Sequence, residues 1–302
     1  MSATAITPTT SIRPPKSRKR LVTPARIGIY AFLLSTSAFF LLPLYVMVVT
    51  SLKTAPEVRQ ALMFAWPASP QFGNWAEAWS SACIAMACEG IKGGFMNSVR
   101  LVVPATVLSV FLGALNGYAL SFWRSKWGNF LFAIMLFGAF VPFQVMIYPL
   151  VAWFRLGGFY NTYWAILLVH CIFGMPVLTL LFRNYYITVP AELFKAARID
   201  GGGFWRIFFQ LMLPMATPMI IVAVILQVTG IWNDYLFGLI FAGRDNYPMT
   251  VQLNNLVNTT FGERRYHIDM AATILTSMVP LLVYFFSGRW FVRGIAAGAV
   301  KG

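Results

Sequence analysis

The chain carries few side chains that could do chemistry. It has nine Asp and Glu residues, two His and three Cys in 302 residues, and no G-x-x-x-x-G-K-[ST] stretch for nucleotide phosphates. The cysteines have no zinc-like spacing with His170 and His267. No nucleophile stands out with a paired base. The sequence therefore predicts no catalytic residues, no metal site and no cofactor held by this chain.

One polar stretch, residues 190–218, interrupts the apolar runs and reads P-A-E-L-F-K-A-A-R-I-D-G-G-G-F-W-R-I-F-F-Q-L-M-L-P-M-A-T-P. Pro190 and Glu192 suit the first turn of a helix, whose dipole favours an acidic side chain there. The small residues Ala196 and Ala197 would let another surface approach closely. The glycines at 201–203 should end this helix, because they tolerate a left-handed exit. The stretch is therefore predicted to be a docking surface.

The composition places this stretch in a membrane protein. Hydrophobic residues make up 59% of the chain and charged residues 11%, against a usual quarter charged. A net charge of +14 would indicate nucleic acid in a soluble chain, but here its distribution matters more than its sum. A helix needs ~20 residues to cross a ~30 Å hydrocarbon layer. Six apolar runs approach or exceed that length, at 27–49, 95–122, 129–154, 163–181, 213–242 and 270–286.

These runs do not alternate apolar and polar residues as a barrel would, so the fold class is predicted to be an all-α membrane protein with six transmembrane helices. Fifteen of the 23 Lys and Arg residues fall on the side of the amino terminus. This bias predicts that both termini are cytoplasmic. The predicted organisation is a disordered basic tail (1–26), a first helix (27–51), a periplasmic loop (52–93), a transmembrane domain (94–290) that contains the cytoplasmic loop 190–212, and a tail (291–302).

Two external loops have distinctive residues. Cys83 and Cys88 lie in the loop 52–93, where their separation permits a disulfide ring in an oxidising compartment; two buried thiols are the alternative. The polar loop 243–268 either reaches toward an external partner or is simply solvated. Cys171 is predicted to be a packing residue inside a span.

The fifth apolar run is too long for a single straight span. At 1.5 Å per residue it would reach ~45 Å, and polar residues interrupt its second half, so we expect a break or tilt there. Asp234 in this half is either part of a transport path or a packing carboxylate bonded to nearby backbone. Asp269 is interpreted as a helix cap and His170 as a packing residue.

The polar stretch resembles the coupling loop, or "EAA" loop, of permease subunits from bacterial ATP-binding-cassette (ABC) importers. The matching positions are Ala196, Ala197, Asp200, Gly201, Leu213, Pro214 and Pro218. Lys195 stands where the family usually has glutamate, which leaves Glu192, one turn earlier, for an acidic contact, and Gly202 replaces the usual alanine. The resemblance implies that an ATPase subunit contacts Glu192, Lys195, Ala196, Ala197, Asp200 and Gly201.

Two further stretches resemble the carbohydrate-import branch. The W-N-D pattern at Trp232, Asn233 and Asp234 implies, together with Tyr235, a place near the translocation path or its outer gate. Residues 291–302 resemble the end of the second permease subunit of maltose-type importers. That likeness implies that Gly298, Ala299 and Lys301 contact the ATPase dimer; a frayed terminus is the alternative.

The overall sequence looks closest to glucose/mannose-type permease subunits. The resemblance implies the type I ABC importer fold and a non-catalytic sugar permease of the bacterial inner membrane. Its implied partners are a second homologous permease in a heterodimer, two ATP-binding subunits that hold ATP and Mg, a periplasmic sugar-binding protein and membrane lipid, with no nucleic acid. Maltose or another oligosaccharide is the alternative substrate. An ion-coupled secondary transporter or a membrane enzyme is the alternative class.

Overall fold

The computed structural model describes residues 23–84, 87–123, 127–258 and 264–299, with side chains as far as residue 288. Within these ranges the fold is helical, and an isolated bridge between Ile84 and Ala87 is the only β pairing. The prediction of an all-α membrane protein is confirmed. Most of the predicted amino-terminal tail lies outside the described residues, although its last three residues already belong to the first helix.

The chain divides into two units, Met1–Val46 and Met47–Gly302. The first unit holds most of α1 (Pro24–Ser51), which is long and apolar enough to cross a membrane and lies at the position of the first predicted span. Large apolar side chains such as Phe39 and Phe40 are exposed along it. These side chains fit a helix surrounded by lipid, since lipid tails solvate apolar groups.

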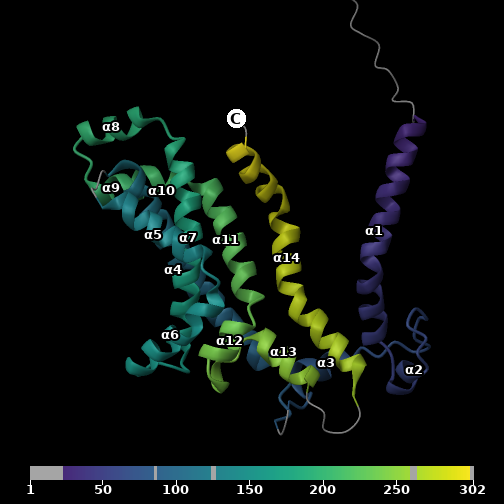
Figure 1. Cartoon of the computed structure of the whole chain (residues 1–302). Coiled ribbons are helices and arrows are strands. Elements are labelled where there is room, and N and C mark those ends of the chain that lie inside the picture. Colours follow the sequence, from purple (N-terminus) through teal and green to yellow (C-terminus); the bar gives the residue numbers. More distant parts are fainter. Residues whose placement is uncertain (1–22, 85–86, 124–126, 259–263, 300–302) are drawn as a thin grey trace, which may run out of the picture. The chain divides into compact units, whose positions relative to one another are not determined.

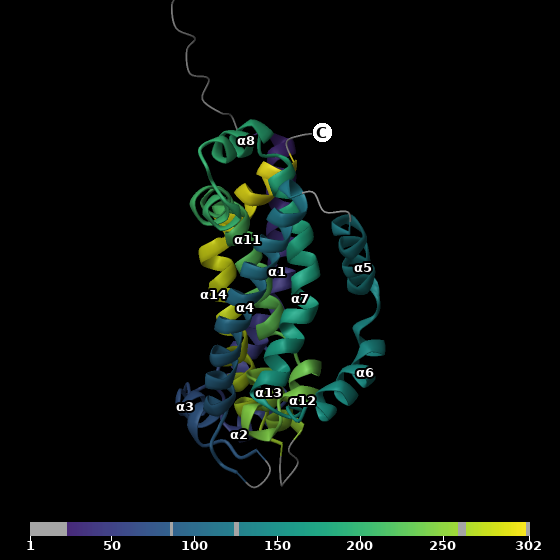
Figure 2. The same ribbon diagram turned by 90° about the vertical axis from the view of Figure 1, so that its left-hand side faces the viewer.

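The second unit is built around α4 (Lys92–Phe122) and α7 (Tyr163–Ile187), which run side by side in both views (Figures 1 and 2). Glycines on α4 permit the close approach. A Cβ placed on Gly113 would lie 2.6 Å from Leu178 Cβ, and one on Gly117 would lie 2.7 Å from Phe182 Cβ. Small residues are the usual device by which membrane helices pack closely.

The third predicted span, 129–154, is bent, which the sequence did not predict. The structure has α5 (Gly128–Phe140) and α6 (Phe143–Leu156), bent by 107° from one another. Val141 and Pro142 lie at the break. Proline lacks a backbone N–H and disfavours helical geometry in the residue before it, which explains why the helix stops here.

The fifth span breaks where polar residues predicted it. Helix α11 (Thr217–Trp232) ends before Asn233, and α12 (Leu236–Phe241) follows after a short break. At its other end, α11 is bent by 78° from the preceding helical segment, Phe204–Met215. That segment comprises α9 (Phe204–Ile207), the π-helical η1 (Phe208–Met212) and α10 (Leu213–Met215). In the described residues, four single helices and two such bent pairs are apolar and long enough to span a membrane.

The last helix corrects two predictions. Helix α14 (Tyr266–Ala299) begins before Asp269, so this residue lies within the first turns and is not the cap. The same helix continues to Ala299, so the predicted tail is helical as far as residue 299. Gly298 and Ala299 lie at its end, and Lys301 lies outside the described residues.

The second unit has two ends. At one, which we call the α8 end, lie α8 (Ala191–Ile199), α9 and the carboxyl end of α14 (Figures 1 and 2). At the opposite, α13 end lie the remaining short helices, which are α2 (Ala55–Arg59), α3 (Gly73–Ser80), α12, the 3-10 turn η2 (Arg244–Asn246) and α13 (Met249–Asn258). The buried apolar residues form a separate cluster toward each end.

Candidate functional site

Helix α8 presents an exposed face at the α8 end. Glu192, Lys195, Ala196 and Asp200 are all exposed, and Ile199 is 85% exposed. The residues turned inward are Phe194 and Ala197, which pack against the apolar cluster at this end. The face therefore offers charges of both signs, a small residue and one large apolar side chain, which are features of a protein contact surface.

The turn after α8 requires glycine. Gly201 has φ of +77°, a backbone conformation that residues with a Cβ rarely adopt. Gly202 donates its N–H to the Ala197 carbonyl at 2.9 Å, and a Cβ on Gly202 would lie 2.6 Å from that oxygen. The tight turn therefore explains why this chain has Gly202 where the family usually has alanine. Beside it, the side chains of Asp200 and Arg206 line a small hollow of about 160 Å³.

An aromatic cluster, the α4 clamp, fixes α8 and α9 to the end of α4. Its members are Tyr118, Phe122 and Trp123 from the end of α4, and Phe194 and Phe204 from α8 and α9. The Phe122 and Phe194 rings stack at 4.7 Å between centroids. No local pattern predicts this cluster, although the aromatic residues at positions 118, 122 and 123 are an indication of it in the sequence.

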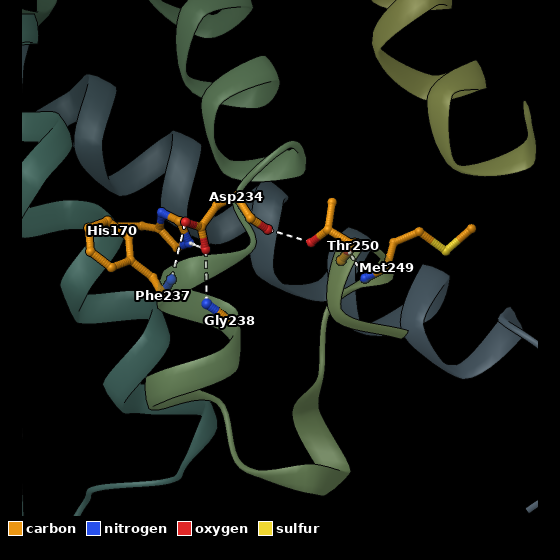
Figure 3. Close-up of polar contacts among 7 residues, drawn as sticks. His170, Asp234, Phe237, Gly238, Met249 and Thr250 are labelled. Atoms are coloured by element: carbon orange, nitrogen blue, oxygen red, sulfur yellow. Dashed lines mark hydrogen bonds and ion pairs between the residues drawn. The ribbon is translucent and has the colours of Figure 1, made fainter. Parts of the chain in front are cut away.

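Asp234 lies in the break between α11 and α12 and binds backbone (Figure 3). Its carboxylate accepts hydrogen bonds from the N–H groups of Phe237 at 3.2 Å and Gly238 at 2.9 Å. These donors belong to the first turns of α12, so the carboxylate caps that helix. The His170 Nε2 atom of α7 lies 3.7 Å from the same carboxylate, and the hydroxyl of Thr250 donates to the Asp234 carbonyl. Asp234 therefore connects α7, α12 and α13. Its carboxylate makes the hydrogen bonds to nearby backbone that were expected if Asp234 is a packing residue.

The four residues predicted for the translocation path point into different environments. Trp232 is only 2% exposed, and its Nε1 donates to the Thr276 carbonyl at 2.9 Å. Asn233 and Tyr235 are exposed, and the Tyr235 hydroxyl donates to Asn254 at 3.1 Å. Only Asn233 and Tyr235 therefore present side chains that a sugar could reach directly.

A polar groove of about 730 Å³ opens at the α13 end. Its polar lining comes from the α3–α4 connection, from η2 and from α13, and includes Glu89, Arg244, Gln252, Asn255 and Asn258. Cys83 and Cys88 form a disulfide that joins the two sides of the turn whose Ile84 and Ala87 also line the groove. Carboxamides, a carboxylate and a guanidinium together can hydrogen-bond either a protein surface or hydroxyl groups. The composition of loop 243–268 predicted its polarity, but no pattern in the sequence predicted a groove.

The fold and a family match together define the class of protein. The fold is a bundle of apolar helices with an exposed amphipathic helix at one end. Residues 105–297 match the family described as "Binding-protein-dependent transport system inner membrane component". The chain belongs to this family, and it is an ABC transporter permease.

Individual relatives agree over long stretches. A "probable ABC transporter permease protein" of Pyrococcus horikoshii is 33% identical over 94% of this chain and 100% of its own length. The alpha-glucoside transport system permease protein AglG of Rhizobium meliloti is 34% identical over 80% of this chain and 64% of its own length. Permeases of this family are non-catalytic, so the predicted absence of catalytic residues in this chain is consistent with its class.

The fold is that of type I ABC importer permeases. A chain in the crystal structure of a bacterial ABC transporter that imports the acidic polysaccharide alginate superposes with a TM-score of 0.74. The superposition covers 92% of this chain and 100% of that one at 19% sequence identity. This likeness concerns the fold alone.

Proposed function

We propose that this permease forms a sugar translocation pathway with a second, homologous permease and that α8 couples the pathway to a separate ATPase dimer. The observation that carries the proposal is the exposed face of α8, which is held against the bundle by the α4 clamp. This face would lie in a cleft of the ATPase, with Lys195, Ala196 and Asp200 at the contact. The ATPase partner would hold ATP and Mg, and this chain would hydrolyse nothing.

The α8 end is proposed to be cytoplasmic, in the inner membrane. The surplus of Lys and Arg in the sequence supports this orientation, since positive residues accumulate in cytoplasmic segments. The carboxyl end of α14 lies at the same end as α8, which would bring Gly298 and Ala299 near the same ATPase (Figure 1).

Transport would then follow from two arrangements of the bundle. Closure of the ATPase dimer on ATP displaces α8 and shifts the pathway between inward and outward openings. A shift from 1:99 to 99:1 between the two arrangements requires about 5.5 kcal/mol of differential binding, an amount that a nucleotide and a protein interface can supply together.

The α13 end is proposed to receive the external sugar-binding protein. The groove there combines Glu89 and Arg244 with carboxamides from α13, and the disulfide restrains its rim. A surface that mixes both charges and amide groups suits a transient protein contact, whose interface is polar at its rim. Asp234 supports this end from within by capping α12.

The substrate is proposed to be glucose or mannose, with maltose or another oligosaccharide as the alternative. The named substrates of similar permeases differ, from alpha-glucosides in AglG to alginate in the solved importer. Because the Trp232 ring is buried, the Tyr235 ring and the Asn233 amide are the groups that would meet a sugar.

The experiment reconstitutes the complex with both permeases, the ATPase and the binding protein in liposomes. Replacing Asp200 by Arg together with Gly201 by Val should abolish the stimulation of ATP hydrolysis by the sugar-loaded binding protein, while membrane insertion stays intact. Unchanged stimulation would refute coupling through α8. Uptake of labelled glucose, mannose and maltose by the unmodified complex identifies the substrate.

Orientation has its own test. Ile199→Cys on α8 should react with a membrane-impermeant maleimide only in inverted vesicles, because its side chain is highly exposed at the α8 end. Asn258→Cys, exposed at the α13 end, is the matched control and should react in intact spheroplasts. The opposite labelling pattern would place α8 outside the cell and would exclude an ATPase contact.

A further inference from the structure

We propose that Tyr118 is a positioning residue that makes α8, α9 and the α8 ends of α4 and α7 move as one body. The proposal rests on the coupling function proposed for α8. It adds a route for the coupling: a displacement of α8 is transmitted to the bundle through its contacts with α4, a helix far from α8 in the sequence.

Tyr118 occupies the centre of the contacts at the α8 end. Its side chain is fully buried, and its ring lies 4.9 Å from the Phe204 ring and 5.4 Å from the Phe208 ring. Its hydroxyl donates a hydrogen bond to the Phe204 carbonyl at 3.1 Å. This carbonyl belongs to the first residue of α9, so one side chain of α4 holds both the ring and the backbone of the segment after α8.

Two further contacts join α8 itself to α4. Phe194 stacks on Phe122, and the Arg198 guanidinium lies 4.7 Å above the Trp123 ring. A cation over an indole ring is attracted by the ring quadrupole. The contacts therefore come from both α8 and α9 and converge on the last residues of α4 and on Trp123, which follows it.

The same cluster includes α7. Tyr186, near the end of α7, is buried and lies 6.4 Å from the Tyr118 ring. Phe182, one turn earlier, is buried against Gly117 of α4. Packed aromatic side chains do not deform continuously, so a displacement of the cluster moves α4 and α7 together.

The covalent route from α9 into α11 is less direct. The helical segment that starts at Phe204 turns by 78° at Ala216 before α11 begins. Tyr185 of α7 donates to the Met215 carbonyl at 2.5 Å, so even this bend is attached to α7. A displacement of α8 is therefore transmitted to α4 and α7 before it reaches α11.

The test removes a single hydroxyl. Tyr118→Phe keeps the ring but removes its hydrogen bond to the Phe204 carbonyl, which retains the Phe208 N–H as a donor, so the loss is about 1 kcal/mol. We expect roughly a fivefold fall in sugar transported per ATP hydrolysed in the reconstituted complex, which is that energy converted at RT of ~0.6 kcal/mol. The ATPase should still co-purify with the variant, because the α8 face is unchanged.

The matched control is Tyr163→Phe. The Tyr163 hydroxyl donates to the Arg100 carbonyl at 2.9 Å, so it ties the same helix α4 to the backbone, but at the α13 end. Its transport per ATP should stay within twofold of the unmodified protein. An unchanged ratio in Tyr118→Phe, or an equal fall in both variants, would overturn the role of Tyr118. Failure of the unmodified permease to co-purify with any ATPase would instead overturn the proposed function, and this inference with it.

A second variant tests the rigid body directly. Phe122→Cys and Phe194→Cys, joined by a short bismaleimide, would lock α8 to α4. Because these helices are proposed to stay together throughout the cycle, the linked protein should transport as well as the same double variant without linker. Loss of transport on linking alone would show that α8 moves relative to α4 and would overturn the proposal.

Discussion

The two ends of the second unit differ in the side-chain contacts that stabilise them. At the α8 end the contacts are aromatic, with Tyr118, Phe194 and Phe208 in one buried cluster beneath an exposed helix. At the α13 end an apolar cluster that includes Trp232 and Phe241 is joined by polar contacts: the carboxylate of Asp234 on α12, an ion pair between Glu77 and Arg265 and a disulfide. The α8 end can therefore transmit force as a packed block, and the α13 end keeps short elements in place around an open groove.

The different contacts at the two ends follow from the elements that each end exposes to its surroundings. At the α8 end, α8 has an exposed face, and Tyr118, Tyr186 and Phe208 are buried beneath it. At the α13 end, α12, η2 and α13 are short and their terminal backbone groups need partners. Side-chain caps such as Asp234 supply those partners, because unpaired backbone groups are costly away from water.

The largest effect should come from emptying the aromatic cluster. Phe208→Ala removes a fully buried ring and should lower the free energy of unfolding by about 3–5 kcal/mol. Phe209→Ala is the control, since its neighbouring ring is 49% exposed and should cost much less. Thermal unfolding in detergent micelles measures both variants. Equal losses would show that the cluster is not a packed block.

A smaller effect is expected from filling the contact between α4 and α7. Gly117→Ala places a Cβ 2.8 Å from the backbone N of Arg183, so the helices must move apart at a cost of about 1–3 kcal/mol. At Gly138 on α5 a Cβ meets nothing within 4 Å, and Gly138→Ala should be neutral or stabilising by up to ~1 kcal/mol. A lower melting temperature in both variants, or in neither, would contradict the close packing of α4 on α7.

Asp234 tests the polar end. Asp234→Ala removes the acceptor for the Phe237 and Gly238 N–H groups and should destabilise by about 0.5–2 kcal/mol. Asp234→Asn keeps one side-chain oxygen and should recover most of the stability and of the sugar uptake. If the Asn variant is stable but does not transport sugar, the charge of Asp234 acts in the pathway itself.

The smallest effect concerns pH at the α13 end. Backbone N–H groups of Thr54 and Ala68 bind the Glu57 carboxylate and hold its pKa below the ordinary value of 4.5. Because the folded state favours the ionised form, the stabilisation is complete above the ordinary pKa and is lost as the pH falls through the lower folded pKa. The melting temperature of Glu57→Gln should therefore approach that of the unmodified protein as the pH falls below the ordinary pKa of 4.5. A constant difference over this range would contradict the lowered pKa.

The sequence predicted the elements that depend on local composition. Apolar length located the spans, glycines located the end of α8, and polar residues located the break after Trp232. It did not predict the bend between α5 and α6 within the third span, and it was wrong about Asp269, because α14 already starts at Tyr266. The roles of Lys195, Gly298 and Ala299 at an ATPase stay predictions.

By itself, the sequence determined the membrane class, the positions of most spans and the likeness to an importer coupling loop. These properties follow from transfer to lipid and from short-range backbone preferences, which neighbouring residues set. The tertiary structure decided which residues meet, such as Tyr118 with the Phe204 carbonyl, and which of Trp232 and Asn233 is buried. Such contacts depend on how helices distant in the sequence cross and rotate against one another, and no local pattern encodes that geometry.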